Sequence, residues 1–254
     1  TSRLFYTNEN NHFLVRIDGR DAAIELLGQP FWEIQPVSLH EVERIEIIRG
    51  PGSALYGANA LTGVISITTR SVPETTSARV HLAGGEVGSA GVWASGGTRS
   101  GDWGFSLSSS AERAGMFFTP RTAGKQVWKL RSVVSYHFDQ HTSLLGDFGI
   151  SGGSGPLSTP VGTVDGDSLY PTLRLSYRSE DLTAQAYWME SSMTVSLRAP
   201  IDYGGIRLAR FIPMDVLGRT IDAEAQITLP RFWDPLHVIA GGQARTSWLR
   251  SDQM

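Results

Sequence analysis

From Pro73 onward, apolar and polar residues alternate with a period of two, and this alternation restricts the fold more than any other feature of the sequence. Residues 220–229 show it most clearly, with isoleucine, alanine or leucine at each odd position and acidic, amide or hydroxyl side chains at each even position. Residues 103–108, 170–178 and 182–188 repeat the pattern. Because successive side chains of a β-strand point to opposite sides, each segment is predicted to be a strand with one apolar and one polar face.

A soluble β-sandwich can carry the same strands, so the connections between them must distinguish the two classes. Residues 138–141, 179–181 and 230–235 are predicted to be short turns, whereas 151–168 and 191–218 are predicted to be long polar loops. Short turns on one side and long loops on the other are typical of outer-membrane β-barrels. Aromatic residues also fall near predicted strand ends, where an aromatic girdle would lie: Trp103, Trp128, Tyr136, Tyr177, Trp188 and Trp248.

The composition excludes several classes of protein. Cysteine is absent from the 254 residues, which excludes disulfides, cysteine–zinc sites and thiol nucleophiles. The net charge of −3 gives no basic surface for nucleic acid. No stretch approaches the ~18 uninterrupted apolar residues of a membrane-spanning helix, a condition that β-barrel strands do not need to meet.

The residues before Pro73 are predicted to form a small α+β unit. Its expected elements are a strand at 13–17 that ends in the turn Asp18-Gly19, a helical turn at 39–43 capped by Ser38, and strands at 45–48 and 64–69. The change of pattern therefore predicts two domains, residues 1–72 and residues 73–254.

A glycine-rich loop joins the last two strands of this unit. Gly50, Gly52, Gly57 and Gly63 provide backbone freedom where the chain reverses, and Pro51 ends the strand because it lacks a donor N–H. The loop lacks the Gly-Lys-Ser/Thr ending and the Gly-x-Gly-x-x-Gly spacing of phosphate-binding loops. We therefore do not expect nucleotide binding.

Residues 43–67 read ERIEIIRGPGSALYGANALTGVISI, and residues 13–20 read FLVRIDGR. Together they resemble the plug domain of TonB-dependent receptors, proteins of the Gram-negative outer membrane. The resemblance implies a mainly β fold: part of a small α+β plug, followed by about nine strands of the family's 22-stranded antiparallel transmembrane barrel. It also implies a plug loop motif made of Gly50, Pro51, Gly52, Tyr56, Gly57 and Gly63.

The resemblance implies active uptake of a scarce solute of the iron-siderophore, haem or cobalamin type. Its implied partners are the TonB complex, through a plug segment absent here, outer-membrane lipid, a small-molecule or metal-chelate ligand, and other outer-membrane chains. Nine strands alone would leave two unpaired sheet edges in lipid, so we expect either a longer native chain or a second chain that completes the barrel. The second case defines the alternative: a non-transporting, receptor-like barrel that serves as a structural component of an outer-membrane assembly.

In the family, plug arginines pair with glutamates of the barrel wall. By resemblance, Arg49 is the best match for such an anchor, and Arg44 and Arg20 are further candidates. Arg44 and Glu43 are equally consistent with a solvated surface pair. Candidate substrate-facing residues are Asp21, Phe31 and Trp32, although packing inside the plug explains the two aromatic residues equally well.

No enzyme active site, metal site or cofactor is predicted. The six histidines are scattered, and neither a His-Glu-x-x-His nor a Gly-x-Ser-x-Gly motif is present. Asp222 and Glu224 lie on the polar face of a predicted strand. We expect them to line a water-filled lumen rather than act as a catalytic acid and base.

Overall fold

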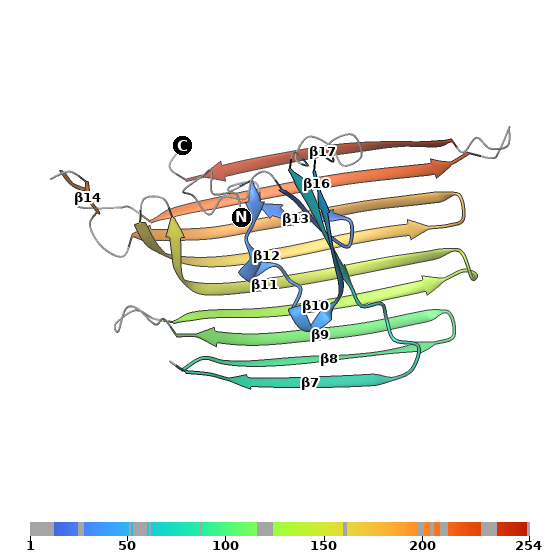
Figure 1. Ribbon diagram of the computed structural model, residues 1–254, viewed down its shortest axis with the longest axis horizontal. Helices are drawn as coiled ribbons and strands as arrows, with labels where there is room; N and C mark the ends of the chain where they lie inside the picture. Colours follow the sequence, from blue (N-terminus) through green and yellow to red (C-terminus); the bar gives the residue numbers. More distant parts are fainter. Residues whose placement is uncertain are drawn as a thin grey trace.

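The computed structural model describes residues 13–24, 28–50, 52, 60, 62–86, 88–115, 124–159, 162–197, 201–203, 206–208, 213–229 and 238–252. Nine long strands form one antiparallel sheet in which almost every strand pairs with its neighbours in the chain. Figure 1 shows them as a broad sheet with the N-terminal elements lying across one face. The strands, together called the wall, are β7 (Ser77–Gly84), β8 (Ala90–Ser100), β9 (Trp103–Ala114), β10 (Lys125–His137), β11 (Ser143–Thr159), β12 (Gly162–Arg178), β13 (Leu182–Leu197), β16 (Met214–Thr228) and β17 (Ile239–Ser251).

The short turns fall at one end of the sheet. Residues 138–142 join β10 to β11, and residues 179–181 join β12 to β13, as predicted. Asp139 stabilises the first turn by accepting hydrogen bonds from the backbone N–H groups of His141 and Thr142, both at 2.7 Å. These bonds hold the pKa of the Asp139 carboxyl below its usual value, because they favour the ionised form.

The prediction of a long loop at 151–168 is wrong. β11 continues to Thr159 and β12 begins at Gly162, and their backbones pair along this whole length. Glycine and serine carry no apolar side chains that would reveal a period of two, but backbone pairing does not need one. Much of the predicted loop 191–218 also belongs to β13 and β16, and the connection between them contains the short hairpin β14 (Ile201–Tyr203) and β15 (Ile206–Leu208).

The outward face of the wall is apolar and carries aromatic side chains towards both ends. Trp103 and Tyr136 pack together near the short turns, with ring centroids 4.8 Å apart, whereas Trp128 lies at the opposite end of β10 and is 44% exposed. Trp128 and Tyr136 are eight residues apart, which is about 27 Å along the strand. With a tilt of about 35–45° this corresponds to about 19–22 Å across the membrane, slightly less than the ~25 Å apolar band of outer-membrane barrels. Trp188 lies within β13 rather than at its end, because the strand extends to Leu197. In the described ranges no helix is long and apolar enough to cross a membrane.

The N-terminal elements, called the plug unit (described residues from 13 to 72), form a four-stranded sheet in the order β2-β1-β6-β5. β1 and β6 are parallel, and the other two pairs are antiparallel. Asp18 and Gly19 make the β1–β2 turn with φ of 49° and 87°. Serine 38 caps a 3-10 turn through a capping box with Glu41, as its sequence position predicted. The elements are β1 (Phe13–Ile17), β2 (Arg20–Asp21), β3 (Ala23–Ile24), β4 (Gln29–Pro30), η1 (Trp32–Ile34), η2 (Leu39–Glu41), β5 (Val42–Arg49) and β6 (Gly63–Thr69).

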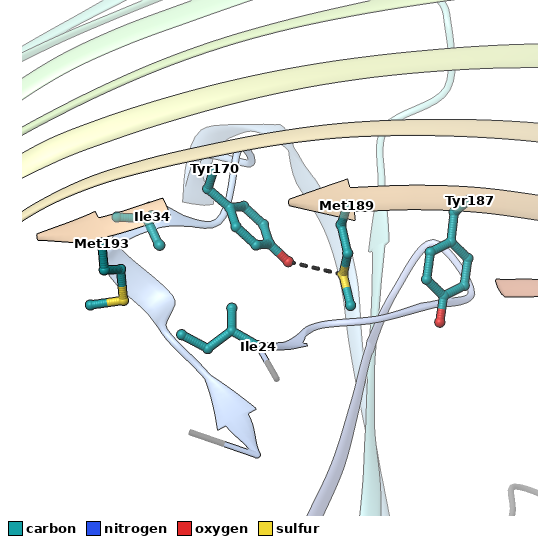
Figure 2. Close-up of a cluster of buried hydrophobic side chains, with 6 residues drawn as sticks. All are labelled: Ile24, Ile34, Tyr170, Tyr187, Met189 and Met193. Atoms are coloured by element: carbon teal, nitrogen blue, oxygen red, sulfur yellow. Dashed lines mark hydrogen bonds between the residues drawn. The ribbon is translucent and has the colours of Figure 1, made fainter. Parts of the chain in front are cut away.

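The plug unit and the wall share a hydrophobic core. Ile24 and Ile34 of the plug unit are each 1% exposed and pack against four wall side chains, Tyr170, Tyr187, Met189 and Met193. Figure 2 shows the Tyr170 hydroxyl donating to the sulfur of Met189, at 3.1 Å, beside these isoleucines. The contact removes apolar surface of both parts from water, so it fixes the plug unit against the inner face of the wall.

Replacing Gly149 by alanine is expected to weaken the plug–wall contact by about 1–3 kcal/mol, because the inner face of β11 has no space for an added carbon at this position. A Cβ at this position would lie 2.8 Å from two ring carbons of Pro36 in the plug unit. Gly146→Ala is the matched control, since its Cβ would meet only Leu175, at 3.7 Å. Limited proteolysis of outer-membrane preparations measures the loosening of the plug unit. Equal protection of the two variants would contradict the close approach.

Candidate functional site at the plug–wall interface

Asp18 lies between two arginines of the wall. Its carboxylate accepts a hydrogen bond from Arg131 Nη2 at 2.9 Å, and its backbone carbonyl accepts one from Arg174 Nη1 at 2.9 Å. Both guanidinium groups also contact Asp147, which accepts from Arg131 Nε at 2.9 Å and from Arg174 Nη2 at 3.1 Å. All four side chains are at most 12% exposed. They form a buried network that joins β10, β11 and β12 to the β1–β2 turn.

The plug unit holds Asp18 in place from its own side. The backbone N–H and the hydroxyl of Thr69, at the end of β6, both donate to the Asp18 carboxylate at 2.8 Å. Asp18 itself adopts a positive φ, which aspartate tolerates better than most residues. One carboxylate therefore connects the β1–β2 turn, the last strand of the plug unit and the wall.

The segment from η1 to η2 makes further contacts with β9, β10 and β11. Glu33 pairs with Lys125 at 2.5 Å, and the carbonyl of Val37 accepts from Lys129 Nζ at 3.1 Å. Glu41 accepts from the Ser108 hydroxyl at 2.5 Å, and it lies 3.6 Å from Arg131. In addition, the Ser151 hydroxyl donates to the carbonyl of Ile34. Basic groups of the wall thus meet oxygen atoms of the plug unit along the whole segment.

The opposite side of the plug unit contacts β16 and β17. Arg16 Nη2 donates to both carboxylate oxygens of Glu224, at 2.9 and 3.1 Å, and Arg16 Nε donates to the Gly19 carbonyl at 2.7 Å, which orients the guanidinium. Asp21 pairs with Arg245 at 2.7 Å. Asp222 accepts from the Gln243 amide at 2.8 Å and is fully buried. Asp222 and Glu224 were expected to line an open lumen, but the plug unit covers this part of the inner face.

The three arginines predicted as anchors lie in different surroundings. Arg20 is 5% exposed and donates to the Tyr170 hydroxyl and to Gln35 Oε1, each at 3.1 Å. It therefore meets the wall through a tyrosine rather than through a glutamate. Arg44 makes an exposed pair with Glu46 of its own strand at 3.3 Å, and Arg49 is exposed at the end of β5. Within the described residues, no ion pair joins either of these two to the wall.

The remaining predicted site residues are also spread out. Asp21 and Phe31 contact the wall through Arg245 and Lys125, the latter with its Nζ 5.8 Å from the Phe31 ring centroid. Trp32 is 47% exposed. Gly50 has φ of 98°, and its N–H donates to the Thr62 carbonyl. At Gly63 a Cβ would lie 2.5 Å from the Ile48 carbonyl oxygen. Gly52 also donates to a backbone carbonyl of the loop, that of Ala60, whereas Pro51, Tyr56 and Gly57 lie outside the described residues.

Sequence reasoning missed the residues that make most of the plug–wall contacts. Asp18 was assigned only to a turn, and Arg16, Glu33 and Glu41 were not singled out. A usable signal was present at Arg174, which occupies the polar face of the predicted strand 170–178. Charged side chains that face the inside of a closed sheet require partners, and the plug unit supplies them. The described residues contain no group of three histidine or acidic side chains that could hold a metal ion.

Asp18→Asn is expected to destabilise the seated plug unit by about 3 kcal/mol or more, because it leaves the buried Arg131 and Arg174 with Asp147 and the more distant Glu41 as their carboxylates. The matched control is Arg219→Gln, which removes the exposed pair of Arg219 with Glu190 and is expected to cost less than about 1 kcal/mol. Thermal melting of the folded protein in detergent, together with protease accessibility of the plug unit, measures the difference. Equal melting temperatures for the two variants would contradict the role assigned to Asp18.

Comparison with known proteins begins with the sequence of the plug unit. Residues 5–64 match the family described as TonB-dependent Receptor Plug Domain. The vitamin B12 transporter BtuB of Photobacterium profundum is 38% identical over 79 residues, which are 31% of this chain and 13% of that protein. An iron-regulated outer membrane virulence protein of Vibrio cholerae is 51% identical over 45 residues, 18% of this chain and 7% of that protein. The matched part is thus a small fraction of these relatives.

Solved structures resemble the whole described fold. The copper transporter OprC matches with a TM-score of 0.76 and 17% identity over 94% of this chain and 38% of its own. The FrpB iron transporter of Neisseria meningitidis matches with a TM-score of 0.72 and 14% identity, over 95% of this chain and 42% of its own. The siderophore receptor PirA of Pseudomonas aeruginosa matches with a TM-score of 0.66 and 17% identity, over 95% of this chain and 41% of its own. The chain spans less than half of each of these proteins.

The predicted fold class is confirmed: the chain is mainly β, with an antiparallel barrel-type sheet preceded by a plug domain. The plug sequence match covers residues 5–64, and the shared fold extends over nearly the whole chain. Residues 5–64 therefore carry a plug domain of the TonB-dependent receptor type, and the chain as a whole has the fold of solved transporters and receptors.

Proposed function

We propose that the chain serves active uptake of a scarce solute through the outer membrane, driven by the TonB complex. In this proposal, residues 1–72 are the C-terminal part of the plug and residues 73–254 are the first nine strands of the barrel. The observation that carries the proposal is the contact between them: buried ion pairs and hydrogen bonds seat the plug unit against the inner face of a membrane-type sheet. A seated plug blocks a pore at rest, and its displacement opens one.

The two parts are held by different kinds of bond, which supports movement of the plug rather than of the wall. Neighbouring wall strands pair through continuous backbone hydrogen bonds, and β11 and β12 alone pair over 17 residues. The plug unit is attached mainly by side chains such as Arg16, Asp18 and Glu41. Water can replace side-chain contacts one at a time, whereas an opened ladder in lipid exposes many unsatisfied backbone groups together. Force on the plug therefore disrupts the interface before the wall.

The relatives named for an activity are transporters and receptors for vitamin B12, copper, iron and siderophores. Solutes of these kinds are the proposed class here, and no reaction on the solute is part of the proposal. The names lend no support to the alternative of a purely structural component.

The predicted site residues enter the proposal in two groups. Arg20 is an anchor through its buried contacts with the wall. Arg49 and Arg44 are proposed as anchors on the side of the plug unit that faces away from the described wall, where β5 is exposed along its length. Trp32, Asp21 and Phe31 are proposed to face the solute, and the 47% exposure of Trp32 supports this for that residue.

A disulfide between the plug unit and the wall is expected to abolish uptake. The sequence has no cysteine, and a Cβ at Gly149 would lie 2.8 Å from that of Pro36. A shift of about 1 Å brings Pro36→Cys and Gly149→Cys to disulfide geometry. Uptake of labelled iron-siderophore and cobalamin by cells, with and without a protonophore, gives the measurement.

The oxidised double variant should lose at least about tenfold of the energy-dependent uptake and regain it after reduction, because the bond removes the plug displacement that uptake needs. Each single variant, treated with the same oxidant, is the control for damage caused by the substitutions alone. Uptake at the unmodified rate by fully cross-linked protein would disprove the proposed mechanism.

A further inference from the structure

We infer that four basic residues on the inner face of the wall select negatively charged, oxygen-rich solutes, and that plug oxygens mask these residues at rest. The residues, called the basic series, are Lys125, Lys129, Arg131 and Arg174. The inference rests on the proposed uptake function and names the charge class of the solute and the residues that discriminate it.

The basic series follows one line along the inner face. Lys125, Lys129 and Arg131 lie on the same face of β10, the inner one. They are less exposed than Trp128 and Leu130, which lie between them in the sequence and point outward. Six residues separate the first from the third, which is about 20 Å along a strand. Arg131 pairs in register with Gly149, and Gly149 with Thr172. Arg174 therefore continues the line two residues farther towards the short-turn end of the sheet.

Every member of the basic series contacts an oxygen atom of the plug unit. Lys125 contacts the Glu33 carboxylate at 2.5 Å, and Lys129 donates to the Val37 carbonyl at 3.1 Å. Arg131 meets the carboxylates of Asp18 and Glu41, at 2.9 and 3.6 Å. Arg174 donates to the Asp18 carbonyl at 2.9 Å. The plug oxygens thus occupy the positions that oxygens of a solute would take.

The charge balance changes when the plug moves. At rest, the four cations face the plug carboxylates of Asp18, Glu33 and Glu41, together with Asp147 of the wall. In the part of the chain that the structure describes, Asp147 is the wall carboxylate in direct contact with the series, and Glu112 is bonded to Trp93 nearby. Withdrawing three plug carboxylates leaves an excess of positive charge along β10 and β12. The side formed by β16 carries Asp222 and Glu224 instead.

This excess gives the discrimination a physical basis. Arg131 and Arg174 are 6% and 11% exposed at rest, and when the plug oxygens leave, the two guanidinium groups share one wall carboxylate, that of Asp147. Carboxylate, catecholate or phosphate oxygens of a solute can replace the plug oxygens, and they match the planar donors of arginine. A neutral or cationic solute offers no such exchange. An anionic metal chelate therefore lowers the free energy of the open state selectively.

The test compares import of two iron complexes by cells that carry the receptor: a negatively charged ferric tris-catecholate and a neutral ferric tris-hydroxamate. The variant is Lys125→Gln with Lys129→Gln, which spares the more buried arginines and the fold that depends on them. Lys125→Arg with Lys129→Arg preserves the charge and should rescue import. The matched control is Arg219→Gln on β16, an exposed arginine 2.5 Å from Glu190.

Wild-type receptor should import the anionic complex in preference to the neutral one. The double glutamine variant should lose about tenfold more of that import than of the import of the neutral complex, the usual scale for charge-assisted hydrogen bonds, because weaker seating of the plug affects both complexes alike. Equal loss for both complexes, or failure of the arginine rescue, would overturn the basic series as a selector. Protonophore-sensitive import of cobalamin or of the neutral complex alone would overturn the inference and leave the uptake function standing. Loss of protonophore sensitivity for every solute would overturn both.

Discussion

The buried contact of Asp18 with Arg131 and Arg174 is the interaction on which the rest of the arrangement depends. Asp18 is bonded within the plug unit to Thr69 and across the interface to two wall strands, so it links the wall to the β1–β2 turn and to the end of β6. Buried arginines in a β-sheet are unfavourable unless each has a partner. The wall itself provides one carboxylate, that of Asp147, for Arg131 and Arg174 together. The inner face of β10 to β12 is therefore complete only when the plug unit is seated.

This incompleteness suits a transporter better than a static channel wall. Backbone pairing holds the strands to one another, and side-chain pairs and a small apolar cluster hold the plug unit to the strands. The apolar cluster of Ile24 and Ile34 with Met189 and Tyr170 gives adhesion without strict geometry, since methionine side chains adapt to their neighbours. The charged contacts fix the position of the plug unit relative to the wall strands. A plug held in this way can be seated in one position and still be removed by force.

Local elements were predictable because their causes are local. The strand at 13–17, the turn at Asp18-Gly19, the Ser38 cap and the strands around 45–48 and 64–69 all follow from side-chain period, turn residues and capping chemistry. Residues 151–168 were assigned wrongly to a loop, because glycine and serine carry little information about faces while their backbones pair normally. The plug–wall contacts were not predictable in the same way. The partners of Arg131 and Arg174 are 113 and 156 residues away in the chain.

The sequence by itself determined the plug domain, through residues 43–67, and the two faces of four wall strands, through the period of two. Both are properties of residues close together in the chain, so the sequence is enough to predict them. Only the tertiary structure decided which charges meet between the plug unit and the described wall: Asp18 with Arg131, and Arg16 with Glu224. The physical reason is that ion-pair partners are set by how the plug sheet is rotated and seated against the wall. That orientation depends on the packing of Ile24, Ile34 and the close approach at Gly149, which bring together residues far apart in the chain.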